Sequence, residues 1–268
     1  MNKEQKIKPK KSLGQNFLTD ASVAVRILEA ADIREGDRVF EIGPGMGALT
    51  GRLLGKRAQV VAVELDHALV TRLEQEFEHS EGFSILEKNV LDMDVSAYLR
   101  ASGFVDGAYK VVANIPYYIT APIIRMILAL PVRPERIVLM VQKEVAERLA
   151  AAPGKTSLLS VMAQYYADVE LVFVVPKESF DPVPKVESAV VRLTPTRRFD
   201  ADLDRKFFRV VRAGFAARRK TLANNLASSF RLPKADAEKF LEGIGLVSNV
   251  RAQELPISAW EQLAGMIG

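Results

Sequence analysis

The stretch Glu41-Ile42-Gly43-Pro44-Gly45-Met46-Gly47 decides the fold of this 268-residue chain. It follows an apolar run, Arg38 to Ile42, and precedes a helix-like segment, Ala48 to Leu54. A strand, a tight glycine turn and a helix in this order are typical of a loop that binds a nucleotide-like ligand. Glycines at alternate positions let the backbone approach such a ligand without a clash from Cβ atoms.

The glycine spacing is unusual for a dinucleotide site. Such sites carry G-x-G-x-x-G and direct a helix N-terminus at a pyrophosphate, whereas this chain has E-x-G-x-G-x-G. A carboxylate before the turn would repel phosphate. The pattern favours a ligand with a nucleoside, no phosphate and a positive charge, which describes S-adenosylmethionine. We expect the loop to bind the methionine end of that molecule, with Glu41 near its charge.

Strand-like and helix-like segments alternate after the glycine loop, which predicts a mostly parallel sheet with helices on both faces. The remaining strand-like runs are Val60–Glu64, Phe83–Leu86, Lys110–Ala113 and Ile137–Val141. The helix-like segments are Ala68–Phe77, Pro122–Leu130 and Lys143–Ala150. Two late runs, Leu171–Val175 and Ser188–Leu193, are expected to form an antiparallel hairpin at the sheet edge.

The pattern changes near Thr194-Pro195-Thr196, after which only helix-like segments follow. They are Leu203–Phe215, Thr221–Phe230, Ala235–Ile244 and Ser258–Ile267. We therefore predict a flexible basic arm over residues 1–11, an α/β domain over 12–196 and a small all-α domain over 197–268.

Composition excludes several kinds of chemistry. The chain has no cysteine and two histidines, His67 and His79, so thiolate nucleophiles, cysteine-ligated zinc and Ser-His-Asp triads are not expected. We predict no metal site. No apolar run approaches the roughly 20 residues of a membrane span, and the basic N-terminus lacks an apolar signal core. The cytoplasm is the expected compartment, with no membrane partner.

The net charge of +4 is unevenly distributed. Residues 1–11 hold five lysines against Glu4, and residues 192–220 hold ten Arg or Lys against three Asp. Two basic regions on an otherwise acidic chain indicate contact with a polyanion such as nucleic acid. Such a chain is expected to dock as a monomer on a large particle.

Acidic residues follow two of the predicted strands. Glu64 ends a strand about 20 residues past the glycine turn, where a carboxylate can accept hydrogen bonds from ribose hydroxyls. Asp92 follows the next strand and can accept from the exocyclic amine of the cofactor's adenine. Asp66 and Asp94 fit helix caps better.

Asn114-Ile115-Pro116-Tyr117 is the most specific tetrapeptide of the chain. The side-chain carbonyl of Asn114 and the backbone carbonyl of Ile115 or Pro116 can accept from an exocyclic amine. Pro116 stiffens the turn. Tyr117 can stack on the base that carries this amine. Methyl transfer to such an amine has a neutral thioether as leaving group, and its main demand is positioning.

These motifs resemble the amino-methyltransferases with the signature [D/N/S]-[I/P]-P-[Y/F], and more closely the KsgA family of ribosomal RNA adenine dimethyltransferases. The resemblance runs from about Lys10 to the C-terminus. Besides the glycine loop, Glu64-Leu65-Asp66 and the Asn114 motif, it rests on three further segments. They are Gly14-Gln15-Asn16-Phe17-Leu18, Phe180-x-Pro182-x-Pro184-x-Val186-x-Ser188 and Phe215-x-x-Arg218-Arg219-Lys220-x-Leu222. Asn89 stands where relatives often have Gly.

The resemblance implies a Rossmann-like class I methyltransferase that dimethylates two adjacent adenosines in the 3′-terminal hairpin of 16S rRNA, within the small ribosomal subunit. S-adenosylmethionine would be consumed and S-adenosylhomocysteine released. The implied cofactor residues are Asn16, Leu18, Gly43, Gly45, Glu64, Asp92 and Asn114. The implied catalytic residues are Asn114, Pro116, Tyr117 and Phe180, and Arg218, Arg219 and Lys220 would bind RNA.

Three other interpretations share some of these features. An Erm-type enzyme, which methylates 23S rRNA, has the same central motifs, but the late loop and the basic segment favour the KsgA type. A non-catalytic RNA-binding assembly factor could keep the fold, although Glu64, Asp92 and Asn114 are intact. A DNA adenine methyltransferase would need a separate base-reading domain.

Overall fold

The structure, a computed structural model, describes residues 9–10, 13–197 and 199–267. The chain forms two compact units. The first contains residues 1–146 and 169–195, and the second contains residues 147–168 and 196–268. The C-terminal division lies beside the one we predicted, but residues 147–168 group with the C-terminal helices. Most of the predicted basic arm, residues 1–8 and 11, lies outside the described residues.

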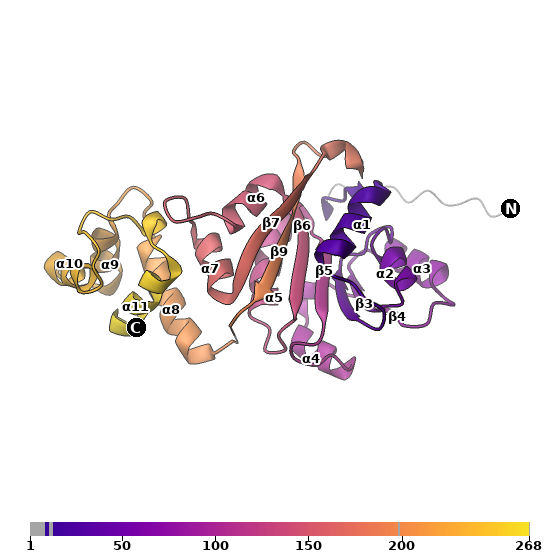
Figure 1. The fold of residues 1–268 in the computed structure, drawn as a ribbon, viewed down its shortest axis with the longest axis horizontal. Helices are drawn as coiled ribbons and strands as arrows, with labels where there is room; N and C mark the ends of the chain where they lie inside the picture. The colour runs from indigo at the N-terminus through magenta and orange to yellow at the C-terminus, as the bar shows by residue number, and fades with distance from the viewer. Residues whose placement is uncertain (1–8, 11–12, 198, 268) are drawn as a thin grey trace. The chain divides into compact units, whose positions relative to one another are not determined.

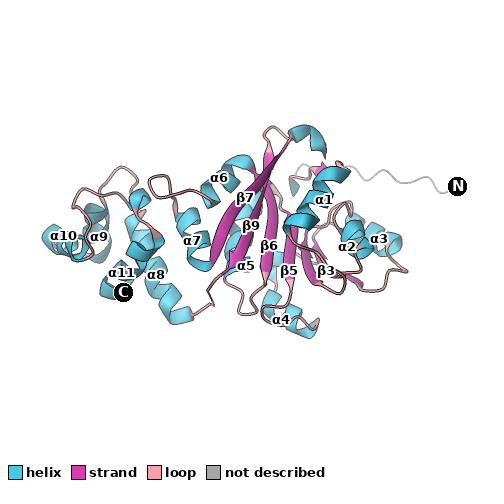
Figure 2. Ribbon diagram, in the orientation of Figure 1, coloured by secondary structure: helices cyan, strands magenta, loops and turns pink. Residues whose placement is uncertain are grey.

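The first unit is built on a seven-stranded sheet with the strand order β4-β3-β2-β5-β6-β9-β7 (Figures 1 and 2). Its strands are β2 (Arg38–Ile42), β3 (Gln59–Glu64), β4 (Phe83–Glu87), β5 (Lys110–Asn114), β6 (Arg136–Gln142), β7 (Ala167–Val175) and β9 (Ser188–Pro195). Strands β2 to β6 pair in parallel, and β9 pairs with β6 antiparallel. The α/β class, the mostly parallel sheet and its antiparallel edge are thus confirmed.

Strand order explains where the site lies. The chain passes from β2 outward to β3 and β4 and then returns to β5 on the other side of β2. In open parallel sheets, ligands bind beyond the carboxyl ends of the strands at such a reversal. The glycine loop after β2 and the Asn114 motif after β5 follow two neighbouring strands, so both reach the same edge.

The helices of the first unit are α1 (Ala21–Ala30), α2 (Thr50–Gly55), α3 (His67–Glu76), α4 (Val95–Ala101) and α5 (Thr120–Leu128). Helix α6 (Lys143–Leu149) crosses the division between the units. Short 3₁₀ turns follow β4 (η2, Val90–Asp92) and β5 (η3, Tyr117–Ile119). Asp20 and Asp66 cap α1 and α3 by accepting from backbone N–H groups two residues ahead.

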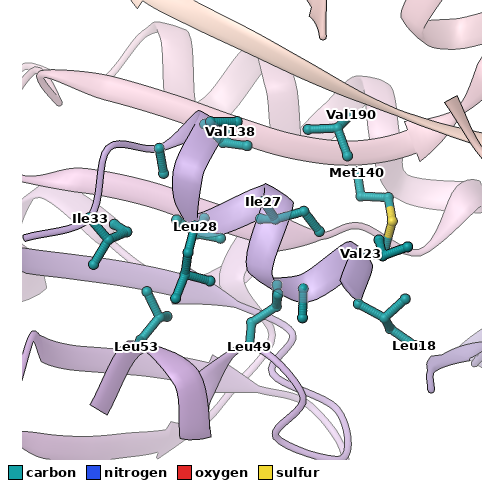
Figure 3. Packing of buried hydrophobic residues seen from close by; sticks show 14 of the residues in the cluster. Leu18, Val23, Ile27, Leu28, Ile33, Leu49, Leu53, Val138, Met140 and Val190 are labelled. Atoms are coloured by element: carbon teal, nitrogen blue, oxygen red, sulfur yellow. The ribbon is translucent and has the colours of Figure 1, made fainter. Parts of the chain in front are cut away.

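Helix α1 fills the space between the sheet and α2. Figure 3 shows its Ile27 and Leu28 between Leu49 and Leu53 on one side and the sheet residue Val138 on the other. All of these side chains are buried. Alternate residues of β6, such as Ile137 and Leu139, are equally buried, and their period of two places them on the opposite face of the sheet. Both faces of the sheet are therefore covered, and the strands read as continuous apolar runs.

A small second sheet joins distant parts of the first unit. Strands β1 (Phe17–Leu18) and β8 (Phe180–Asp181) pair antiparallel, with Leu18 opposite Phe180. The backbone carbonyl of Ser179 also accepts from the Thr19 N–H (2.9 Å). This pairing brings the N-terminal GQNFL motif and the late Phe180 motif together.

The second unit is helical. It contains α7 (Leu158–Tyr166), α8 (Ala201–Gly214), α9 (Leu222–Phe230), α10 (Lys234–Gly243) and α11 (Ile257–Ile267), with a 3₁₀ turn, η5, at Ala252–Glu254. Helix α7 belongs here because the hydroxyls of Tyr165 and Tyr166 donate to the buried carboxylate of Asp204 on α8 (3.0 and 2.6 Å). Phe207 of α8 also stacks on Tyr165. Within the described ranges, no helix is long and apolar enough to cross a membrane.

Candidate cofactor and target-base site

A cavity of about 170 Å³ lies in the first unit at the carboxyl ends of β2, β3 and β5. Four sequence segments and one late aromatic residue line it: 13–18, the glycine loop, residues 88–91, residues 114–119 and Phe180. Glu64 and Leu65, at the end of β3, also line it, together with apolar residues of the neighbouring strands and helices. The cavity therefore gathers most of the residues that the sequence predicts for a site.

The glycine loop keeps its shape through conformations that suit glycine. Gly43, Gly45 and Gly47 all have positive φ, at 66°, 59° and 81°. A Cβ atom on Gly45 would lie 3.3 Å from the ring of Phe17, and one on Gly47 would lie 2.8 Å from Leu73. The loop is thus held close to the N-terminal segment on one side and to α3 on the other.

Glu64 is held by backbone donors at the mouth of this loop. Its Oε1 accepts from the N–H groups of Leu65 (2.8 Å) and Asp66 (3.0 Å), and its Oε2 accepts from Gly45 N–H (3.2 Å). Burial raises the pKa of Glu64, and these hydrogen bonds oppose the rise. Three of about four acceptor positions of the carboxylate are used, so one remains for a ligand hydroxyl.

Glu41 does not lie where the sequence suggested. Its side chain is buried beneath the loop and is not part of the cavity lining. Thr50 Oγ1 donates to its Oε2 (2.8 Å), while its Oε1 has no partner among the described residues. Burial raises the pKa of Glu41 to about 8. A mostly neutral, covered acid is unsuited to a position beside the cofactor's charge, and that placement is corrected.

The N-terminal segment lies along the cavity and is tied to the start of α3. Asn16 and Leu18 line the cavity, as does Gln15. The buried Asp66 carboxylate accepts from Lys10 Nζ (2.7 Å) and Gln15 Nε2 (2.9 Å). Burial works against ionisation of Asp66, but these two donors lower its pKa on balance.

Asp92 is directed differently from the prediction. It ends the 3₁₀ turn η2 and is absent from the cavity lining, which includes Asn89, Val90 and Leu91. Its Oδ2 accepts from Asn89 Nδ2 (2.7 Å), and Asn89 Oδ1 in turn accepts from Leu91 N–H (3.1 Å). The tight turn thus places Asn89 in the cavity lining and Asp92 outside it.

Asn114 and Pro116 stand where β5 gives way to the η3 turn. Asn114 lines the cavity, and its Nδ2 makes a long contact of 3.5 Å with the backbone carbonyl of Asn16. The Pro116 carbonyl accepts from Ile119 N–H (3.2 Å) and Thr120 Oγ1 (3.3 Å). Because the turn already uses the Pro116 carbonyl, the Ile115 carbonyl is the better candidate for a second acceptor.

Tyr117 is oriented by a residue that sequence reasoning did not single out for a role. Its hydroxyl lies 2.8 Å from Oγ of the buried Ser188, the first residue of β9. Burial raises the pKa of Tyr117, so the phenol is neutral at physiological pH. Phe180 also lines the cavity but exposes only 3% of its surface, because it packs in the core beside β1.

The comparisons with known proteins agree with this geometry. A family model described as "Ribosomal RNA adenine dimethylase" matches residues 6–267. The chain belongs to the ribosomal RNA adenine dimethylase family. The dimethylase is similar to ribosomal RNA small subunit methyltransferase A of Dehalococcoides mccartyi, strain CBDB1, with 39% identity over 96% of this chain and 88% of that protein. It is also similar to the protein of the same name from Synechocystis sp., with 41% identity over 97% and 96% of the two chains.

Solved structures have the same fold. The 23S rRNA methyltransferase ErmE is 26% identical, with a TM-score of 0.74 over 94% of this chain and 99% of that one. A dimethyladenosine transferase from Plasmodium falciparum is 24% identical, with a TM-score of 0.76 over 92% and 95%. Family membership makes this dimethylase an S-adenosylmethionine-dependent rRNA methyltransferase. The interpretation as a non-catalytic factor is set aside.

The residues present suit S-adenosylmethionine. The glycine loop offers backbone at close range, Glu64 offers a buried acceptor, and Leu65, Val90 and Leu91 offer apolar surface. Leu65 is 46% exposed beside Glu64 and lines the cavity; sequence reasoning gave it no role, although it directly follows the acid at the strand end. In the described part of the chain, no group of three or more His, Cys, Asp or Glu forms a metal site.

The basic segment of the dimethylase divides into paired and unpaired residues. Arg192, Arg197 and Arg205 form ion pairs with Glu170, Glu261 and Asp202, respectively.

Arg218, Arg219 and Lys220 are exposed, and none of them has an ion pair with another described residue. These three residues lie in the turn between α8 and α9, and not in a helix.

Proposed function

We propose that this dimethylase adds two methyl groups to the N6 amine of each of two adjacent adenosines in the 3′-terminal hairpin loop of 16S rRNA. The substrate would be the small (30S) subunit, late in its assembly in the cytoplasm, with the enzyme acting as a monomer. One observation carries the proposal: the Asn114 motif and the glycine loop meet in one cavity. The small-subunit relatives support the choice of RNA.

The cofactor supplies a methyl group bonded to a positively charged sulfur, and the chain supplies its binding surface. Gly43 and Gly45 would face the methionine portion, and Glu64 would accept from the ribose hydroxyls. Asn89, in place of Asp92, would accept from the adenine amine. Asn16 and Leu18 would close the cavity from the N-terminal side.

The target base must leave its stack to reach the cavity. The Asn114 amide oxygen and the Ile115 carbonyl would then accept from its N6 hydrogens. Two such acceptors favour a pyramidal nitrogen whose lone pair is free to attack. Tyr117 and Phe180 would contact the faces of the base, and stacking of this kind contributes roughly 1–3 kcal/mol per base. Pro116 stiffens the turn that carries both Asn114 and Tyr117.

RNA binding would rest on the unpaired cations Arg218, Arg219 and Lys220 of the second unit. Because they are exposed and have no internal acidic partners among the described residues, they are available to phosphates. Affinity for RNA should therefore fall steeply as salt concentration rises.

A second candidate is an Erm-type activity on 23S rRNA. The likeness to ErmE, over almost the whole of both chains, is the observation that favours it. Against it stand the higher identities, 39% and 41%, to small-subunit methyltransferases.

Tritiated methyl transfer tests the proposal. Ribosomal RNA from a strain that lacks the modification is offered both as naked RNA and as small subunits, and primer extension then locates the modified bases. We expect two adjacent stops near the 3′ end of 16S rRNA. Stops confined to 23S rRNA would establish the Erm-type activity in its place, and no incorporation into either RNA would contradict both.

A further inference from the structure

Four aromatic side chains line the cavity: Phe17, Tyr117, Tyr118 and Phe180. Phe180 is buried, and Phe17 and Tyr117 are partly buried. Tyr118 differs from them because 55% of its surface is exposed. It therefore borders the cavity and is also accessible from solvent.

The position of Tyr118 is fixed by its surroundings. It is the middle residue of the η3 turn, which Thr120 closes by donating to the Tyr117 carbonyl (3.2 Å). Its ring approaches Gly14 so closely that a Cβ atom there would lie 3.2 Å from Cδ1. Gly14 has a φ of 56°, so its backbone conformation also favours glycine. The ring thus lies close to Gly14, while more than half of the residue's surface is exposed.

We propose that Tyr118 is a second base subsite, on which the nucleobase next to the target adenine stacks. This inference rests on the proposed function. Extrusion of the target base uncovers a face of its neighbour, and an exposed aromatic ring at the cavity mouth can cover that face. Every base has a π-face, so an aromatic ring can stack on any of the four bases.

The surrounding residues favour a nucleobase as the occupant. Other exposed apolar residues of the first unit, such as Leu65, Val183 and Val186, are aliphatic. Among the described residues that line the cavity, Tyr118 is the exposed aromatic one. Lys88 also lines the cavity and is exposed, which provides a cation for an RNA phosphate. In the described residues, the Tyr118 hydroxyl has no hydrogen-bond partner, so internal bonding does not explain the residue.

A double-mutant cycle tests the subsite. Enzyme saturated with S-adenosylhomocysteine is titrated with a synthetic RNA hairpin that has two adjacent loop adenosines, intact or with the neighbour of the target made abasic. We expect Tyr118→Ala to weaken binding of the intact hairpin about 5- to 150-fold, the range that corresponds to loss of one stacked base. The abasic hairpin should bind the wild type and Tyr118→Ala equally. Tyr118→Phe should behave as the wild type, because it keeps the ring.

Two results would overturn the proposal. Equal losses with intact and abasic hairpins would show that Tyr118 does not contact the neighbouring base. Weaker binding of S-adenosylhomocysteine to Tyr118→Ala in calorimetry, with RNA affinity unchanged, would show that the ring covers the cofactor. The binding cycle does not need turnover, so a wild type that transfers no methyl group would contradict the proposed function without deciding the subsite.

Discussion

The cavity has two walls that are held in different ways. The glycine-loop wall, formed by Gly43–Gly47 and Glu64, is fixed by backbone hydrogen bonds, such as those from the N–H groups of Gly45, Leu65 and Asp66 to Glu64. The target wall, formed by Asn114–Tyr117, is held in addition by contacts of its own side chains with distant segments. Tyr117 contacts Ser188, which is 71 residues away, and Asn114 contacts Asn16, which is 98 residues away.

This difference bears on how each wall responds to change. Backbone donors are present whatever the side chains are, so the glycine-loop wall should keep its shape when a neighbouring residue is replaced. In the target wall, backbone hydrogen bonds such as that from Ile115 N–H to the Met140 carbonyl (3.1 Å) hold the turn, but the orientation of the Asn114 and Tyr117 side chains depends on individual amide and hydroxyl groups. Variants of the target wall should therefore affect catalysis, whereas variants of the glycine-loop wall should affect cofactor binding and stability.

Asn114→Ala should have the largest effect. It removes an acceptor for the attacking amine, and loss of one preorganised polar contact to a reacting group lowers kcat on the order of 10²- to 10³-fold. RNA binding should be largely unchanged, since the unpaired cations lie in the other unit. Single-turnover methyl transfer and filter binding measure the two quantities. Asn249→Ala, at an exposed asparagine of the second unit, is the matched control. Lost RNA binding with retained turnover would contradict the assignment.

Glu41→Gln tests the buried acid beneath the glycine loop, which is not itself part of the wall. Burial raises the pKa of Glu41 to about 8 in the folded protein, from 4.5. Between these values the unfolded chain releases a proton that the folded chain keeps, so the free energy of unfolding falls as pH rises. Relative to the variant, the wild type should lose at most about 1.4 kcal/mol per pH unit across this window.

Urea unfolding of both proteins from pH 5 to pH 8 measures this slope. Cofactor affinity should not change, because Glu41 is outside the cavity lining. A constant stability difference across the pH range would show that Glu41 is ionised in the fold. In that case the acid would again be a candidate for contact with the cofactor's charge.

The same contrast explains how much the sequence could reveal. The strand Arg38–Ile42 was predicted with its observed bounds, and the sheet class followed from alternating apolar runs. The roles of the glycine loop and Glu64 could be predicted because they depend on residue spacing within one short stretch of chain. Helix α7 was not predicted. Its place in the second unit could not be predicted either, because it depends on hydrogen bonds to Asp204, far along the chain.

Side-chain partners were the least predictable part of the site. Sequence placed Asp92 at the cavity, but its position depends on the η2 turn, in which Asn89 caps the backbone and donates to Asp92, and Asp92 lies outside the cavity lining. Glu41 was placed beside the ligand because it precedes the loop, whereas the pleat of β2 directs its side chain toward Thr50. Ser188 lies within a quoted motif, yet only the pairing of β9 with β6 brings it to Tyr117.

Glu64→Gln should weaken cofactor binding and leave the fold intact. Hydrogen bonds to a charged group contribute about 1.5–3 kcal/mol, and their loss corresponds to roughly 10- to 150-fold in affinity. Because burial raises the pKa of Glu64, wild-type affinity should also fall as pH is lowered toward that pKa, while the variant should be less sensitive. Calorimetry with S-adenosylhomocysteine measures both effects. Glu87→Gln, at the exposed end of β4, is the control and should bind normally.

Ser188→Ala should have the smallest effect and sharpens the contrast most. The hydroxyl of Ser188 positions Tyr117 and is not expected to touch the target base, so its loss removes one neutral hydrogen bond, about 0.5–1.5 kcal/mol. We expect kcat to fall about 2- to 12-fold with cofactor affinity unchanged. Tyr117→Phe removes the same hydrogen bond from the other side, so the double variant should be no slower than the slower single variant. Additive losses would show that the two residues act separately, and the target wall would then depend less on this long-range contact than its geometry indicates.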